Sequence, residues 1–419
     1  MADLRAALVD AVGAEHVSGD GVPGAEHVSG DGVPGAEHVS GDGVPGAEHV
    51  SGDVVVVPGS TEEVAAVLRV ATEHRATVLP VGSGRTARWL PGPRVDVELH
   101  TGRLDRVLEH SAGDLVVHVQ AGALLTDIQQ AVSGAGQRLG LSSPVEGVTI
   151  GGLLAADLSG PARYLYGTTR DLVIGTTSVR ADGTVTHSGG KVVKNVAGYD
   201  LGKLYTGSRG TLGVITDAWF RLHPLPESTR WVLAQVGNPA AVGHVVSDVR
   251  NSQTAPTAIE VGRGVTGGLT VAVQLDGVSA GIDVRADAVA HVTGGSVTDI
   301  QPSGWGTWPD DDVLLALSYS PASLPAVLDA VGDVALTGSA GVGVLRVGAS
   351  SAQAAGVLSA ARAVCAAHHG TATVVRAPAD HELDVWGPQD PALLALMRRV
   401  KNEFDPAHTL APGRAVGGI

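Results

Sequence analysis

A glycine-rich loop is the first feature of this chain that could do chemistry. Residues 80–86 read PVGSGRT and directly follow an apolar run at 76–81, which we expect to form a strand. Because glycine has no side chain, backbone amides in such a loop can approach a pyrophosphate closely and bind it. The loop therefore predicts a nucleotide site that uses six consecutive residues: Val81, Gly82, Ser83, Gly84, Arg85 and Thr86.

Two other interpretations of the loop stay open on its residues alone. A Rossmann site would take Gly82 and Gly84 as the first two glycines of G-x-G-x-x-G, with Asp105 about 20 residues later at a ribose. However, Ala87 occupies the third glycine position, and the sequence WLPGP at 89–93 disfavours the helix whose amino terminus would hold the phosphate. The third interpretation is a purely structural turn.

Further motifs follow the loop in order, and together they narrow the choice. They are TIGG at 149–152, SGP at 159–161, YG at 166–167, GKVVKNVAGYDL at 190–201 and GSRGTLGVIT at 207–216. The series resembles the FAD-binding domain of the vanillyl-alcohol oxidase family, also called the FAD-linked oxidases. Within that family, the KVVKNVAGYDLGKL run and the ending FDP (404–406) to PGR (412–414) most resemble the FAD-binding E subunits of bacterial glycolate oxidases.

The resemblance implies an FAD cofactor and a set of residues that contact it. Relatives that tether FAD covalently use a histidine in or just after the loop, where this chain has Arg85, Thr86, Ala87 and Arg88, so we expect non-covalent FAD. Besides 81–86, the implied contacts are Pro144, Thr149, Gly151, Gly152, Asp157, Ser159, Gly160, Tyr166, Gly167, Gly210, Gly213, Val214 and Ile215.

Three positions depart from the family pattern. Asp157 stands where the family often has Asn, Arg209 where it often has Glu, and Ala411 where Asn-Pro-Gly is usual. We expect these changes to weaken single contacts and not the family assignment.

No catalytic base can be assigned. Lys194, Asn195, Tyr199 and Asp200 would either stabilise charge near a flavin or form an internal network that orders their loop. The pair His368 and His369 has no neighbouring carboxylate or asparagine, unlike the metal-binding cap motif of relatives that oxidise 2-hydroxy acids alone. We therefore predict no metal site.

The elements that must position these residues alternate between strand and helix. Strands are expected at 53–57, 76–81 and 115–119, and helices after Ser60 and around 124–132. The resemblance gives an α+β fold: a two-subdomain PCMH-type FAD-binding domain with a smaller α+β cap domain. We expect an amino-terminal helix and repeat at 1–52, the FAD-binding domain at 53–225, the cap at 226–395, and a segment returning to the FAD domain at 396–419.

Composition excludes several other classes. The formal charge of −15 disfavours nucleic acid, and no apolar run approaches the roughly 20 residues of a membrane span. The start of the chain, MADLRAALVDA, is unlike a signal peptide. With a single cysteine, Cys365, we expect a cytoplasmic protein whose contact with the inner face of a membrane would be peripheral, through partners.

An 11-residue unit, GAEHVSGDGVP, repeats from residue 13 and ends in a truncated copy at 46–53. Its regularly spaced histidines could suggest a metal array, but the glycine and proline of each unit disfavour a rigid scaffold. We expect a flexible surface loop produced by tandem duplication.

Three functions follow from the resemblance. The first is an FAD-binding subunit of a glycolate oxidase complex, working with a sister FAD subunit and an iron–sulfur subunit on a small 2-hydroxy acid. The second is a self-sufficient FAD-dependent 2-hydroxy acid or alcohol oxidoreductase. The third is a non-catalytic scaffold that retains FAD.

Overall fold

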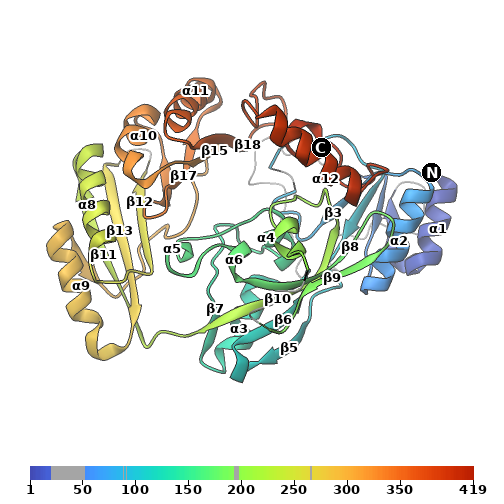
Figure 1. Ribbon diagram of the computed structural model, residues 1–419, viewed down its shortest axis with the longest axis horizontal. Coiled ribbons are helices and arrows are strands. Elements are labelled where there is room, and N and C mark those ends of the chain that lie inside the picture. The colour runs from blue at the N-terminus through green and yellow to red at the C-terminus, as the bar shows by residue number, and fades with distance from the viewer. Residues whose placement is uncertain (20–51, 88, 91, 193–197, 265–266) are drawn as a thin grey trace.

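The computed structural model describes residues 1–19, 52–87, 89–90, 92–192, 198–264 and 267–419. Within these residues the chain forms three β-sheets with helices packed against them, an α+β architecture (Figure 1). Most of the 11-residue repeat and the pair Lys194 and Asn195 lie outside the described residues, so the expectations for them are not addressed.

The first sheet carries the glycine loop. Its strand order is β1 (Val17–Gly19), β2 (Val54–Val56), β4 (Val97–His100) and β3 (Val78–Val81), and helices α1 (Ala2–Val12) and α2 (Thr61–Glu73) share its core. Helix α2 begins where the sequence predicts, because the Ser60 hydroxyl accepts a hydrogen bond from the Glu63 amide at 3.1 Å. The Glu63 carboxylate accepts from the Gly59 amide at 2.7 Å, so this cap reaches one residue further back than a standard capping box.

The second sheet holds most of the remaining glycine motifs. Its order is β5 (Val107–Ser111), β6 (Val116–Gln120), β10 (Val214–Pro224), β8 (Val173–Val179) and β9 (Val185–Gly189), with β7 (Gln137–Leu139) also paired to β10. A turn at Asp182 and Gly183 joins β8 to β9. The connecting helices are α3 (Leu125–Ser133), α4 (Ile150–Ala155), α5 (Arg163–Tyr166), α6 (Thr169–Leu172) and α7 (Leu201–Tyr205).

The third sheet has eight antiparallel strands and forms the cap. Its order is β14 (Ser296–Thr298), β11 (Ser228–Val236), β13 (Leu269–Gly277), β12 (Ala258–Arg263), β16 (Leu336–Ser339), β17 (Val344–Ala349), β15 (Val313–Ser318) and β18 (Thr371–Arg376). Helices α8 (Pro239–Asn251), α9 (Ser279–Thr293), α10 (Leu324–Val331) and α11 (Ser351–Ala367) cover its outer face (Figure 1). The inner face of the sheet, which these helices do not cover, therefore faces the other two sheets.

The end of the chain returns to the first sheet through helix α12 (Pro391–Phe404) and the segment after it. Val78 of β3 donates to the Thr409 carbonyl at 2.7 Å, and its own carbonyl accepts from the Ala411 amide at 2.8 Å. The buried Lys401 ammonium holds this segment by donating to the carbonyls of Thr211 and Leu410 and, at 2.7 Å, to Asp405. The tail is thereby fixed beside the loop that follows β3.

Among the helices of the described ranges, none combines the length and the apolar character that a membrane crossing requires.

Candidate functional site

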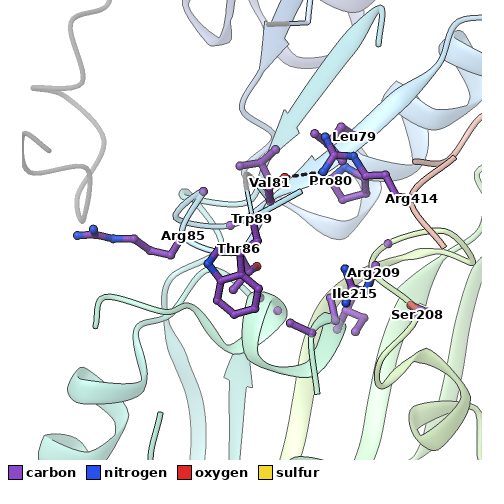
Figure 2. Close-up of a pocket in the computed structure, with 18 of the residues that line it drawn as sticks. Leu79, Pro80, Val81, Arg85, Thr86, Trp89, Ser208, Arg209, Ile215 and Arg414 are labelled. Atoms are coloured by element: carbon purple, nitrogen blue, oxygen red, sulfur yellow. Dashed lines mark hydrogen bonds between the residues drawn. The ribbon is translucent and has the colours of Figure 1, made fainter. Parts of the chain in front are cut away.

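A cavity lies around the glycine loop, and we call it the glycine-loop cavity (Figure 2). It encloses about 1250 Å³, including its open mouth. Residues 79–87 form one wall, and helix α4 with residues 208–215 forms another. Val385, Trp386, Gly413 and Arg414, from the carboxyl-terminal quarter of the chain, complete it.

Twelve of the sequence-predicted contact residues line this cavity together. Six come from the glycine loop (Val81, Gly82, Ser83, Gly84, Arg85 and Thr86), and the other six are Gly151, Gly152, Gly210, Gly213, Val214 and Ile215. The motifs that follow one another along the sequence thus converge on one space, although they come from two different sheets.

The two loop glycines are needed for different reasons. A Cβ added to Gly82 would lie 2.1 Å from the Thr149 hydroxyl, so the loop packs directly against the start of helix α4. Gly84 has open space around it but a φ of +75°, a conformation that side-chain-bearing residues rarely adopt. Thr149 itself lies behind the wall, where its hydroxyl caps α4 by accepting from the Gly152 amide at 3.2 Å.

The other predicted contacts do not line this cavity. Ser159 and Gly160 line a second cavity. The Tyr166 hydroxyl accepts from Arg138 at 2.6 Å, and its ring packs on His223. Gly167 ends helix α5 with a φ of +84°. Pro144 and Asp157 also lie outside the lining.

Two arginines give the glycine-loop cavity its charge, and the sequence analysis did not assign either to it. The Arg209 guanidinium lies 4.9 Å from the centre of the Trp386 ring, and burial together with the charge of Arg414 lowers its pKa. Arg414 donates through Nη1 to the Ala87 carbonyl, while its Nε and Nη2 have no partner among the residues described. Figure 2 shows Arg85 extending away from both.

These features fit a dinucleotide. The unpaired nitrogens of Arg414, the second guanidinium of Arg209 and a loop of close-approaching amides suit a pyrophosphate. Trp89, Leu90 and Val148 offer apolar surface to a ring system. The lining contains no histidine, cysteine or tyrosine that could form a covalent link, and no cluster of potential metal ligands occurs in the described part of the chain.

Family models match two stretches of the chain that contribute residues to this site. Residues 52–189 match the FAD binding domain, and residues 344–415 match the C-terminal domain of FAD linked oxidases. The cofactor predicted from the glycine series, FAD, is thereby confirmed.

Curated relatives are similar over part of their length. Glycolate oxidase subunit GlcD of Bacillus subtilis is 37% identical over 158 residues, which are 38% of this chain and 34% of that protein. Glycolate oxidase subunit GlcE of Escherichia coli is 34% identical over 160 residues, 38% of this chain and 45% of that protein. D-lactate dehydrogenase of Archaeoglobus fulgidus is 40% identical over 121 residues, which are 28% of this chain and 26% of that protein. The chain therefore matches less than half the length of each.

Solved structures share the whole architecture. p-Cresol methylhydroxylase with substrate bound superposes with a TM-score of 0.72 over 99% of this chain and 96% of that chain, at 16% identity. Alkyldihydroxyacetonephosphate synthase gives a TM-score of 0.65 over 87% and 76%, also at 16% identity. At this identity the similarity supports a shared fold alone, and it confirms the predicted PCMH-type fold.

Proposed function

We propose that this FAD-dependent oxidoreductase, whose sequence matches two domains of FAD-linked oxidases, is the FAD-binding subunit of a glycolate oxidase complex. In this role it takes part in removing hydrogen from a small 2-hydroxy acid and exchanges electrons with a sister flavoprotein and an iron–sulfur subunit. The similarity to two proteins that are each named a glycolate oxidase subunit carries the proposal. Because one of these proteins is GlcD and the other is GlcE, the similarity supports a glycolate oxidase subunit and not the E subunit in particular.

The residues of the glycine-loop cavity would hold FAD without a covalent bond. Amides of Gly82, Ser83 and Gly84 would bind the pyrophosphate, and Arg209 and Arg414 would balance its charge. When bound, the flavin supplies the capacity to accept a hydride. Acid precipitation of the purified protein should leave the yellow colour in the supernatant, and colour retained in the pellet would contradict non-covalent binding.

The dependence on partners follows from what the chain contains. Its single cysteine, Cys365, cannot supply the thiolates of an iron–sulfur cluster, so electrons that leave one at a time need another subunit. Neither of the two cavities is lined by histidine, lysine or aspartate in the described residues, and their one carboxyl, Glu260, is held protonated near neutral pH. Proton removal from a hydroxy acid would therefore be slow in the isolated chain.

A self-sufficient 2-hydroxy acid dehydrogenase is the second candidate. The similarity to D-lactate dehydrogenase of A. fulgidus favours it. A scaffold that keeps FAD without turning over is the third.

One set of measurements separates these functions. The FAD-loaded chain is purified alone and with co-expressed candidate subunits, and anaerobic bleaching by glycolate or D-lactate is followed by absorbance. We expect little bleaching alone, glycolate-dependent reduction in the complex, and loss of that activity when this chain is omitted. Rapid bleaching of the isolated chain would favour the self-sufficient enzyme. Flavin that never reduces in any assembly would favour the scaffold.

A further inference from the structure

A second cavity lies between the FAD-binding part and the inner face of the cap sheet, and we call it the interdomain cavity. Its empty space, with open solvent at the mouth included, is about 350 Å³. Arg163 lines it from the side of helix α5, and Trp308 lines it from a loop. The cap contributes Glu260, Thr337, Ser339 and Arg346.

Strand pairing places four polar side chains of the cap together. Glu260 of β12 is the direct partner of Ser339 of β16, and Thr337 of β16 is the direct partner of Arg346 of β17. Direct partners in adjacent strands, and residues two apart in one strand, project from the same face of a sheet. Glu260, Ser339, Thr337 and Arg346 therefore form one polar patch on the face of the cap sheet that lines the cavity.

This patch has unused hydrogen-bonding capacity. Glu260 Oε1, the Ser339 hydroxyl and Arg346 Nε are buried and make no hydrogen bond of good geometry with a described residue, although Ser339 lies near enough to Glu260 to lower the pKa of that carboxyl against the effect of burial. The side chain of Arg163, across the cavity, makes no hydrogen bond or ion pair with any described residue either. Burying such groups without partners costs stability, so their retention here points to a ligand that supplies the partners.

The cavity carries a positive charge at neutral pH. The guanidinium of Arg346 lies face-on to Trp308, 4.7 Å from the ring centre, and burial with the charge of Arg163 lowers its pKa only to about 10. Burial raises the pKa of Glu260 to about 8, which leaves it uncharged at pH 7. Asp157 is the acid that acts on both arginines, but it forms no ion pair with either among the described residues. Asp171 also acts on Arg163, but neither aspartate lines the cavity, so the lining itself holds two cations and no ionised carboxylate at pH 7.

The position of the cavity links it to the cofactor. Trp308, in its lining, lies 5.5 Å between ring centres from Trp89, which lines the glycine-loop cavity. The two cavities thus meet at this pair of indoles. A ligand in the smaller cavity would be next to whatever fills the larger one.

We propose that the interdomain cavity binds the carboxylate of a two- or three-carbon 2-hydroxy acid through Arg163 and Arg346, with Glu260 and Ser339 facing the hydroxyl. This rests on the proposed function and makes the chain a substrate-binding subunit instead of an electron relay alone. Planar guanidiniums match a carboxylate in charge and geometry, and the small volume excludes a bulky aromatic acid.

Oxalate is a suitable probe, because it offers the same carboxylate but has no hydrogen to lose to the flavin. Its binding to the FAD-loaded chain is measured by titration calorimetry and by the change in flavin absorbance. Ethylene glycol, which has the size of glycolate but no carboxylate, is the ligand control. We expect oxalate to bind and ethylene glycol not to bind.

Variants locate the site. Arg346→Met and Arg163→Met should each weaken oxalate binding at least tenfold at unchanged FAD content, whereas Arg346→Lys should recover part of the affinity. Arg250→Met, which removes an exposed arginine from helix α8 of the same cap, is the control and should bind as the unaltered protein does. Equal oxalate affinity in the folded Arg346 and Arg163 variants would overturn the proposal.

The unaltered protein alone also tests it. If it is loaded with FAD and joins its complex but binds no oxalate, the substrate subsite is wrong while the proposed subunit function stands. If it takes up no FAD, the proposed function itself has failed.

Discussion

The two cavities differ in whether backbone or side chains form their walls. The glycine-loop cavity is mostly backbone: its walls are short continuous segments in which glycines bring main-chain amides to the surface. The interdomain cavity is mostly side chain, and its charged groups come from separate strands and a short helix. Backbone walls can hold the part of a ligand that is common to many enzymes, whereas side-chain walls can change with the substrate while the fold is kept.

The difference also decides how each cavity responds to change. A cavity wall made of backbone is disrupted when a side chain is added at a close contact, because the main chain of the whole segment must then move. A wall made of side chains loses one interaction at a time. The predictions below use this contrast, from the largest expected effect to the smallest.

Gly82→Val should abolish FAD binding, because the added Cβ would lie 2.1 Å from the Thr149 hydroxyl and push the loop or helix α4 out of place. Gly84→Val should do the same through its φ of +75°. Flavin content per protein, measured by absorbance, checks both. Gly134→Val, at an exposed position with no atom within 4 Å of the new Cβ, is the control. Full flavin content in both loop variants would show that the loop is only a turn.

Arg414→Met should weaken FAD binding by roughly ten- to a hundredfold without abolishing it, since a charge-assisted hydrogen bond is worth about 1.5–3 kcal/mol. The dissociation constant is measured by quenching of FAD fluorescence as apoprotein is added. Arg399→Met, an exposed change on helix α12, should leave it unaltered. A loss as complete as that of Gly82→Val would mean that the side-chain part of this cavity matters as much as its backbone.

Oxalate affinity should be constant below pH 8 and fall above it, by up to about tenfold per pH unit. Burial raises the pKa of Glu260 to about 8, and its ionisation would place a negative charge beside the anion. The facing groups do not cancel this: Arg163 stays cationic, Ser339 is neutral, and burial raises the pKa of Tyr319 so that it stays neutral too. Calorimetry from pH 6 to 9 checks it. Glu260→Gln should remove the dependence, and an unchanged profile in that variant would assign it to another group.

Deleting residues 24–45 should change neither cavity. The deletion removes two complete 11-residue units in phase and leaves the pairing of β1 with β2 in place. The deletion shortens the connection between Gly19 and Val54 from 34 to 12 residues, which alters its closure free energy by only about 0.9 kcal/mol. Thermal unfolding and flavin content check this, and a loss of several kcal/mol or of a bound metal would show that the repeat has a structural role.

The sequence predicts the first cavity well for a physical reason. Close backbone approach requires glycine at fixed spacings. The pattern formed by Gly82, Gly84, Gly151 and Gly210 can therefore be recognised in the sequence alone. Strands and helices with clear periodicity were also predicted near their observed positions, as for α2 and β6.

The sequence did not reveal the second cavity: the SGP motif at 159–161, which lines it, was assigned to the cofactor, and the cap residues opposite share no local pattern. Glu260 and Ser339 are 79 positions apart and become neighbours only through the pairing of β12 with β16. Arg414 is similar: its role depends on the return of the tail to β3, and the surrounding PGR motif by itself says nothing of where the guanidinium lies. Arg209 was visible only as a departure from a family pattern.

The return of the tail has a consequence for the order of events during synthesis. Residues 409–411 hydrogen-bond to Val78, and Gly413 and Arg414 complete the cavity whose loop lies more than three hundred positions earlier. Domains begin to fold from the amino terminus while translation proceeds. Even if the glycine loop forms early, its cavity stays open along the edge of β3 until residues 409–414 have been synthesised and have left the ribosome. Stable uptake of FAD therefore follows the synthesis of this segment, and ribosome-bound chains stalled before residue 409 should carry no flavin.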